Sequence, residues 1–285
     1  MFKFCFPSLL MVIVTTGFSF TDSSTVHQEP VPTPVPNAKT PQAAPRTVQI
    51  LLDVDADLLI ENSDGKRTGL DFKSGKFVDE IPGARVISGE ASSTYVLPLD
   101  KSGKPYKLSV SGKSSTPVIA DLSMTGPGFV IGFRGLGLVS GQVQKLSMAS
   151  NGLSFTANQD GPSPQFFLTT QSGRGKPSYR FEVTSSLLIA GKTFTLDLNA
   201  DKGWLYFKTD DAQKDSFAVM MRRTNPGGTR DVFTHKDISF SAKNSYAMDF
   251  GQWDGKSALC FYLAGDLENA EKKQCTNLKN ESSTQ

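Results

Sequence analysis

The chain contains 285 residues, with 30 basic and 28 acidic side chains and a formal net charge of +2. Because the charge is nearly balanced, the sequence offers no basic surface of the kind that nucleic-acid binding requires, and nucleic acid is not an expected partner. Only two histidines occur, and one of them, His27, lies in a proline-rich stretch. A zinc site with two histidine ligands is therefore excluded from the folded part of the chain.

Residues 1–20 have the layout of a secretory signal peptide. One lysine precedes an apolar run from Phe4 to Val14, and small residues follow that run. The run is shorter than the roughly 18 to 20 residues of a membrane span. The sequence therefore predicts a protein that is secreted or lies in the periplasm or cell envelope, in contact with the membrane only through this segment. An uncleaved anchor stays open as the alternative.

The composition changes twice after this segment. Residues 21–46 carry a proline every two to four positions without apolar periodicity, which predicts a disordered, extended linker. From Thr47 onward, short apolar segments alternate with turn residues. We expect a first β-sandwich module over 47–116, repeat-containing β modules over 117–276, and a disordered tail over 277–285.

The apolar segments predict an all-β fold. Segments such as YKLSVSG, KTFTLDL and WLYFKT are short, rich in β-branched and aromatic residues, and bounded by Gly, Pro, Asn or Asp. This pattern favours antiparallel tandem β-sandwich modules rather than helices. Only residues 266–274, DLENAEKKQ, are compatible with a helical turn, and a charged hairpin loop fits them equally well.

Three segments of about 50 residues resemble one another, with units that begin near Gly128, Tyr179 and Asp231. Leu138, Gly141, Leu146 and Met148 recur as Leu188, Gly191, Leu196 and Leu198, and one inserted residue later Gly152 matches Gly203 and Phe155 matches Tyr206. FTLDLNADKG, from Phe194, also resembles YAMDFGQWDG, from Tyr246. Repeats of this kind can pack as consecutive sandwich layers, which we favour, or around a threefold axis as in a trefoil or prism.

Two cysteines, Cys260 and Cys275, remain once the signal segment with Cys5 is removed. In an oxidising compartment thiols tend to pair. We therefore predict a disulfide between them, which closes a short loop and is worth roughly 3 kcal/mol on the chain-entropy model.

Aspartates at alternate positions raise the question of a calcium site. Asp53, Asp55 and Asp57 have the spacing that opens a calcium-binding loop, but Leu58 stands where that loop needs glycine. Alternation on a strand is the better interpretation, with the apolar residues from Leu52 to Leu58 facing the core and the aspartates facing solvent. Surface Ca²⁺ at these three residues is the less favoured alternative, and no other cofactor or metal is expected.

The segment ENSDGKRTGLDFKSGKF, residues 61–77, is rich in glycine and charge. Asp64-Gly65 and Ser74-Gly75 are typical of tight hairpin turns, whereas a phosphate-binding loop would need to lead into a helix. We expect two turns that flank a short strand around residues 70–72.

Catalytic groupings are sparse. His235 is the remaining imidazole, but no G-x-S-x-G turn accompanies it, so we expect no Ser-His-Asp triad. Carboxylate pairs suited to glycoside hydrolysis stay possible, since Glu80, Glu90, Glu182 and many aspartates are present, but none lies in an unusually apolar context. The sequence therefore predicts a protein that is not an enzyme.

Trp204 and Trp253 lie near corresponding turns of neighbouring units. Exposed tryptophans beside turns stack on sugar rings in many carbohydrate-binding sandwiches, so both are candidate ligand-stacking residues. The interpretation that we favour is that they cap the core of each unit.

Three segments carry a resemblance to a known group of modules: ENSDGKRTGLDFKSGKFVDEIPGA, YVLPLDKSGKPYKLSVSGK and VFTHKDISFSAKNSYAMDFGQWDG. They resemble bacterial secreted tandem β-sandwich modules found as C-terminal tails of extracellular or envelope proteins, some behind von Willebrand type A domains. The matching positions are Asp64, Gly65, Thr68, Gly69, Gly75, Glu80, Ile81, Pro82, Phe233, His235, Asp249, Gly251 and Trp253. The resemblance implies fold and location, attaches no activity to these positions, and makes His235 a packing or turn residue.

We therefore expect a secreted, non-catalytic interaction or structural protein that presents β-sandwich modules to protein or glycan. The alternative is a carbohydrate-active enzyme or lectin that uses surface carboxylates with Trp204 and Trp253. A third possibility is an assembly accessory that pairs its sheet edges with strands of another chain.

Overall fold

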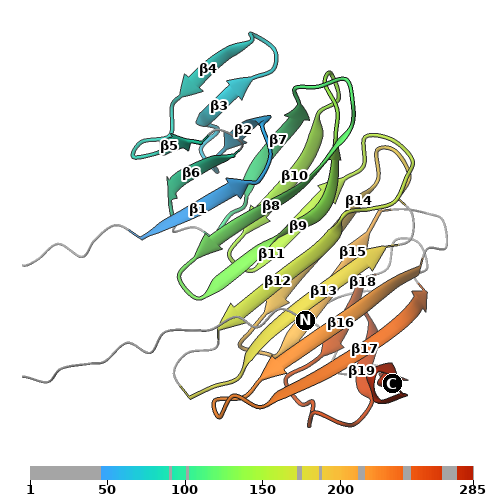
Figure 1. Cartoon of the computed structure of the whole chain (residues 1–285). Helices are drawn as coiled ribbons and strands as arrows, with labels where there is room; N and C mark the ends of the chain where they lie inside the picture. Colours follow the sequence, from blue (N-terminus) through green and yellow to red (C-terminus); the bar gives the residue numbers. More distant parts are fainter. Residues whose placement is uncertain are drawn as a thin grey trace, which may run out of the picture. The chain divides into compact units, whose positions relative to one another are not determined.

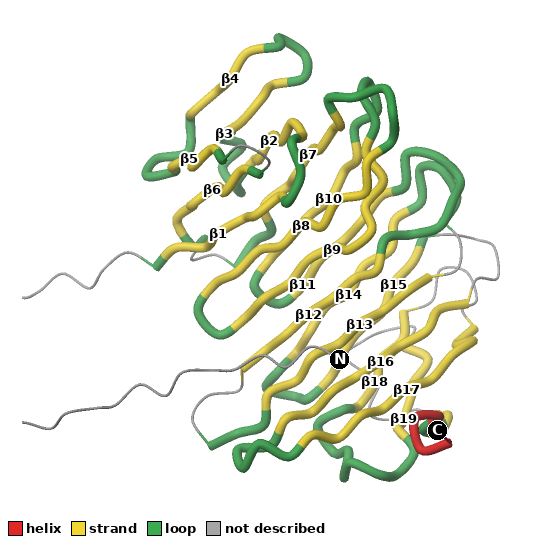
Figure 2. The backbone as a smooth tube through the Cα atoms, viewed as in Figure 1, coloured by secondary structure: helices red, strands yellow, loops and turns green. Residues whose placement is uncertain are grey.

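A computed structural model describes residues 46–89, 92–100, 103–171, 175–185, 188–210, 216–239, 245–264 and 275–284. Within the compact unit Ala44–Gln285, these residues form two antiparallel β-sheets with a shared core (Figures 1 and 2). The predicted all-β sandwich is confirmed. The expected signal peptide, the linker and the ambiguous segment 266–274 lie outside the described residues, apart from Arg46.

Nine strands form one sheet, in the order β17-β16-β13-β12-β9-β8-β1-β6-β5. They are β1 (Thr47–Leu52), β5 (Arg85–Ser88), β6 (Ser93–Pro98), β8 (Val118–Gly126), β9 (Phe129–Leu138), β12 (Gln165–Gln171), β13 (Ser178–Ser185), β16 (Ser216–Thr224) and β17 (Arg230–Ser239).

Eleven strands form the other sheet, in the order β20-β19-β18-β15-β14-β11-β10-β7-β2-β3-β4. They are β2 (Ala56–Glu61), β3 (Arg67–Asp71), β4 (Lys76–Asp79), β7 (Tyr106–Gly112), β10 (Gln144–Ala149), β11 (Gly152–Thr156), β14 (Thr193–Asn199), β15 (Trp204–Thr209), β18 (Ser245–Asp249), β19 (Leu259–Ala264) and β20 (Cys275–Leu278). A 3-10 turn, η2 (Glu281–Thr284), follows β20. Among the described residues, no helix has the length and hydropathy of a membrane-spanning segment.

From β8 onward the chain adds hairpins to the two sheets in turn. The hairpins β8–β9, β12–β13 and β16–β17 join the nine-stranded sheet, and β10–β11, β14–β15 and β18–β19 join the eleven-stranded sheet. Successive hairpins lie side by side, from green to red in Figure 1, and do not close around a threefold axis. Both layers therefore grow together along the chain, while the number of sequence repeats stays a prediction.

The strand register changes one detail of the expected internal similarity. Phe155 pairs with Leu146 in β10–β11, whereas it is Phe207 that pairs with Leu196 in β14–β15. Phe155 therefore corresponds to Phe207 rather than to Tyr206, because the turn between β14 and β15 is the longer one. Alternation then turns Tyr206 away from the core.

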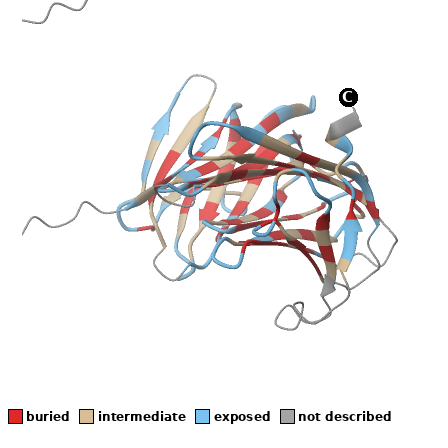
Figure 3. Cartoon of the chain, turned by 90° about the horizontal axis from the view of Figure 1, so that it is seen from below, coloured by how far each residue is buried: buried red, intermediate tan, exposed pale blue. Residues whose placement is uncertain are grey.

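One continuous cluster of buried side chains fills the space between the sheets. Buried and exposed stretches alternate along the strands (Figure 3). In β14, for example, Phe194, Leu196 and Leu198 face inward. The centre is aromatic: the rings of Phe133 and Phe166 lie 5.2 Å apart, edge to face. Each fully buried side chain of this size contributes about 1.5 to 3 kcal/mol to folding.

The expected boundary between 116 and 117 falls inside this sandwich. β1 pairs with β8 in one sheet, and β7 pairs with β10 in the other. Residues 47–116 are thus continuous with 117–276 through both sheets and through the core. Turn residues in the sequence mark where strands end, but they carry no information about which distant strands pair.

Two further expectations differ from the structure at the level of elements. Residues 53–55, expected within one strand, form the crossover from β1 in one sheet to β2 in the other. The tail expected to be disordered over 277–285 is ordered through Thr284, where it completes β20 and forms η2.

The turns expected around β3 are confirmed. Gly65 and Gly75 adopt φ values of 75° and 65°, which favour glycine, in the turns on either side of this strand. The Asn62 side chain stabilises the first turn, since its Oδ1 accepts hydrogen bonds from the backbone N–H groups of Asp64 and Lys66 at 3.0 and 2.9 Å. The strand itself lies slightly earlier in the sequence than expected.

Candidate functional site: an aromatic face on the eleven-stranded sheet

Two rows of side chains cross the outer face of the eleven-stranded sheet, on β14, β15, β18, β19 and β20. The strand register aligns one row in the order Asp197, Tyr206, Ala247 and Tyr262. Two residues away along each strand, the second row contains Asn199, Trp204, Asp249, Cys260 and Asn277. We refer to these nine residues as the outer aromatic face.

The aromatic members of this face form a cluster separate from the core. Trp204 packs on Ala247, and the half-buried rings of Tyr206 and Tyr262 lie against them. The Trp204 and Tyr262 rings are parallel within 4° at a centroid distance of 5.5 Å, and the Tyr206 ring lies 6.0 Å from Trp204. The tryptophan thereby fixes both tyrosine rings in place.

Exposure distinguishes these two tyrosines from the rest. The chain has six tyrosines, and Tyr95, Tyr106, Tyr179 and Tyr246 are all buried. Tyr206 and Tyr262, in contrast, are half-buried. The most solvent-accessible tyrosine rings of the chain thus lie in one row of the outer aromatic face.

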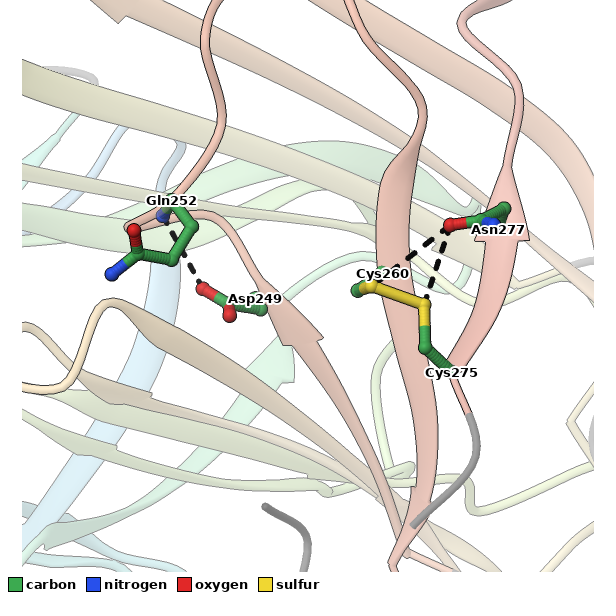
Figure 4. The surroundings of a disulfide bond; sticks show 5 residues. All are labelled: Asp249, Gln252, Cys260, Cys275 and Asn277. Carbon is green, nitrogen blue, oxygen red and sulfur yellow. Dashed lines mark hydrogen bonds between the residues drawn. A yellow bond between two sulfur atoms is a disulfide. The ribbon is translucent and has the colours of Figure 1, made fainter. Parts of the chain in front are cut away.

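A carboxyl group lies in each row. Burial raises the pKa of Asp197 above its ordinary value, and nearby Lys208 opposes this shift. Asp197 covers Gly152 on β11, where a β-carbon would approach its Oδ1 to 2.2 Å, so only glycine leaves room for it. Burial also raises the pKa of Asp249, although backbone N–H groups that include that of Gln252 act in the opposite direction. Figure 4 shows the contact between Asp249 and Gln252.

A hollow of about 560 Å³ opens at the turn end of this face. Asn151, Asp197, Asn199, Asp201 and Tyr206 contribute to its lining. Carboxylate and amide oxygens accept hydrogen bonds from hydroxyl groups, and tyrosine rings offer apolar faces for stacking. The hollow therefore combines hydrogen-bonding groups with an aromatic surface.

The predicted disulfide is present. Cys260 on β19 and Cys275 on β20 are bonded, with their Cα atoms 5.3 Å apart. The bond fastens the last strand of the sheet beside the outer aromatic face, and Asn277 lies against both sulfur atoms (Figure 4). Disulfides persist in oxidising compartments, so this bond points weakly to a location outside the cytoplasm.

Neither tryptophan presents the exposed ring that ligand stacking requires. Trp204 is 7% exposed and Trp253 is 4% exposed. Trp253 packs edge to face on Phe233 and donates its indole N–H to the carbonyl of Ser257 at 2.8 Å. Trp253 thus closes the core, as favoured above, whereas Trp204 supports the tyrosines of the outer aromatic face.

The three aspartates considered for calcium are engaged with protein groups. Asp53 Oδ1 accepts the backbone N–H of Asp121 at 2.7 Å, and Lys113 Nζ lies 2.6 Å from Asp55 and 3.9 Å from Asp57. In the described parts of the chain, no three His, Cys, Asp or Glu side chains are grouped so as to hold a metal ion. The geometry therefore adds no support to a calcium site here.

His235 serves to hold the end of the chain. Its Nδ1 lies 3.0 Å from the carbonyl of Lys279 and 3.5 Å from a carboxylate oxygen of Glu281. Of the carboxylates considered for glycoside hydrolysis, Glu80 pairs with Arg67, and Glu182 lies 2.7 Å from Arg180. Glu90 lies outside the described residues.

The internal similarity aligns Tyr206 with the buried Phe155 and therefore does not identify Tyr206 as an outward-facing residue. Strict alternation in WLYFKT was the available signal, because Leu205 and Phe207 facing the core require Trp204 and Tyr206 to face outward.

Comparisons with protein-family models, with curated proteins and with solved structures found no match.

Proposed function

We propose that this protein is a secreted, non-catalytic binding protein of the cell envelope or exterior, and that its outer aromatic face binds glycans. The observation that carries the proposal is the row in which Tyr206 and Tyr262 flank Ala247. Tyr206 on β15 and Tyr262 on β19 are two strand spacings, or about 10 Å, apart, so the two rings can contact successive sugars of one chain. The export signal and the linker predicted from the sequence would place this face outside the cell.

The surrounding groups support a polar, hydroxyl-bearing ligand. Asp197 and Asp249 supply carboxyl oxygens, and Asn199 and Asn277 supply amides, all on the same face as the rings. Rings with hydrogen-bonding groups at their edges provide both apolar contact and orientation. The residues proposed to stack on sugar rings are therefore Tyr206 and Tyr262, in place of Trp204 and Trp253.

The test is a glycan panel followed by affinity measurements on variants. Wild-type protein is expected to bind at least one class of glycan, and Tyr206→Ala and Tyr262→Ala should each weaken that binding by about tenfold, the loss of roughly 1.4 kcal/mol of ring contact. Lys145→Ala changes an exposed side chain on β10 of the same sheet; it is the control and should bind as wild type does. Retention of full affinity by both folded tyrosine variants would refute the assignment, as would binding of protein ligands alone.

A further inference from the structure

A second cavity lies at one end of the sandwich. It encloses about 210 Å³ between β9, the hairpin β10–β11 and the connection from β11 to β12. Leu136, Phe155, Pro162 and Leu188 provide apolar walls, and the polar lining residues are Gln144, Asn158, Gln159 and Asp160. None of these residues belongs to the outer aromatic face.

Gln144 occupies a position that is aromatic in the neighbouring hairpins. It is the first inward-facing residue of β10, at 6% exposed, followed by the buried Leu146. The first inward-facing residue of β14 is Phe194, and that of β18 is Tyr246. At this position two hairpins place a ring in the core, whereas β10 places an amide.

The cross-strand neighbour is also smaller beside Gln144. Phe194 pairs with Thr209 on β15. On β10–β11, Lys145 pairs with Thr156, so Ala157 follows opposite Gln144. Gln144 and Ala157 together occupy less volume than Phe194 and Thr209 do at the corresponding position. The cavity lies where this volume is missing, since both Gln144 and Ala157 line it.

The amide of Gln144 is only half satisfied. Its Nε2 donates to the carbonyl of Gly137 at 3.1 Å, which fixes the orientation of the amide. Its Oε1 is buried and accepts no hydrogen bond from any residue that the structure describes. An unpaired buried acceptor is unfavourable, so it marks a position where a hydrogen-bond donor is missing. Because Gln144 lines the cavity, a donor held there can supply the missing hydrogen bond while the bond to Gly137 is kept.

We propose that this cavity binds a small planar aromatic molecule with one hydroxyl or ring N–H donor, of the phenol or indole class. The ring takes the place that Phe194 fills in the next hairpin, and the donor pairs with Oε1 of Gln144. A cavity of about 150 Å³ is known to accommodate benzene, so 210 Å³ suits a substituted ring. Ile119, 68% exposed at the cavity, provides apolar surface that a bound ring covers.

The test compares two probes of the same shape by ¹⁹F NMR titration of the full chain. 4-Fluorophenol carries the donor, and 4-fluorotoluene carries a methyl group in its place. Wild-type protein is expected to bind 4-fluorophenol about tenfold more tightly, because only the phenol satisfies the buried acceptor.

Two substitutions at the same position separate shape from hydrogen bonding. Gln144→Met keeps the cavity but removes the acceptor, so both probes should bind with equal affinity. Gln144→Phe supplies the missing ring, so both probes should lose binding while the midpoint of thermal unfolding rises. If Gln144→Phe does not fold, Ala157→Val narrows the cavity from the opposite strand and should weaken both probes by the same factor.

Several results would overturn the proposal. It is wrong if wild-type protein binds neither probe, or binds both equally. It is also wrong if folded Gln144→Met still prefers the phenol, or if the volume-filling variants bind as wild type does. Each of these outcomes is independent of glycan binding at the outer aromatic face, which the Tyr206 and Tyr262 variants address separately.

Discussion

Two aspartates show how position alone sets the protonation of a carboxyl group. The Asp197 side chain reaches solvent on the outer face of the sheet, but partial burial of its carboxyl group raises its pKa above the ordinary value of 3.8. Asp254 is fully exposed, and its pKa falls to about 2 because the hydroxyl and backbone N–H of Ser257 and the backbone N–H of Lys256 donate to it. The two residues therefore affect stability with opposite sign as the pH changes.

Replacement of each aspartate by asparagine should reveal this difference. Because the folded protein binds a proton at Asp197 more readily than the unfolded chain does, its contribution to stability falls as pH rises through and above about 4. Asp197→Asn should thus raise the midpoint of thermal unfolding at pH 7, and this gain should vanish as pH falls below about 4.

Asp254→Asn serves as the matched control. The carboxylate of Asp254 stabilises the fold above the unfolded pKa, and this contribution is lost as pH falls from 3.8 toward about 2. The variant should therefore be less stable than wild type at pH 7 and equal to it near pH 2. Shifts of the same sign for the two variants at pH 7 would contradict the environments described here.

Residue-scale prediction from sequence succeeded where the signal was local. The pairing of Cys260 with Cys275 could be predicted because no other cysteine remains once the signal segment is removed. The two turns at Gly65 and Gly75 could be predicted from the residues that tight turns favour. Trp204 is buried, as favoured from the sequence, but its place on the outer face, apart from the core, was not accessible in this way. It depends on Tyr262, which reaches the same face from β19 through strand pairing that the sequence does not encode locally.

At the scale of single elements, the end of the chain covers a sheet edge. β17 is the last strand of the nine-stranded sheet, and an uncovered edge strand offers backbone groups to other chains. The Asn280 side chain accepts the N–H of Thr234 at 3.1 Å and donates to the carbonyl of Val232 at 2.9 Å. Glu281 accepts the N–H of Lys236 at 3.2 Å. These side chains substitute for the backbone of an additional strand.

Loss of this cover should expose the edge. Asn280→Ala is expected to lower the free energy of unfolding by about 1 to 3 kcal/mol, since it leaves backbone groups of Thr234 and Val232 without these partners. A chain that ends at Lys279 should in addition self-associate in a concentration-dependent way, measured by size-exclusion chromatography with light scattering. Lys279→Ala keeps the backbone carbonyl that His235 contacts and serves as the control. A strictly monomeric truncated chain of unchanged stability would show that the cover has no such role.

The identity of most strands was accessible from the sequence, but their partners were not. Alternation predicted the buried residues Leu52, Ala56 and Leu58 correctly, yet it could not show that the chain changes sheets between Leu52 and Ala56. The same alternation continues through the crossover, because both strands face one core. Pairing of β1 with β8 likewise joins segments that are distant in sequence, and no local pattern reports it.

For the whole molecule, one sandwich extends from Thr47 to Leu278 around a single core. A shared core lets both sheets present long outer faces to solvent, and residues on those faces do not have to fit the core. The outer aromatic face uses this freedom at the C-terminal end of the eleven-stranded sheet, next to the disulfide. Rigid strands hold its rings at fixed spacing, as recognition of a repeating ligand requires.

Glycan recognition by the outer aromatic face should be visible residue by residue in solution. The most direct test is to titrate isotope-labelled protein with the tightest glycan of the panel and to map the shifts of backbone amides. Shifts are expected at β14, β15, β18 and β19, centred on Tyr206 and Tyr262, with little change around Gln144. Shifts confined to β4 and β5, or to the cavity beside Gln144, would show that the glycan does not bind at this face.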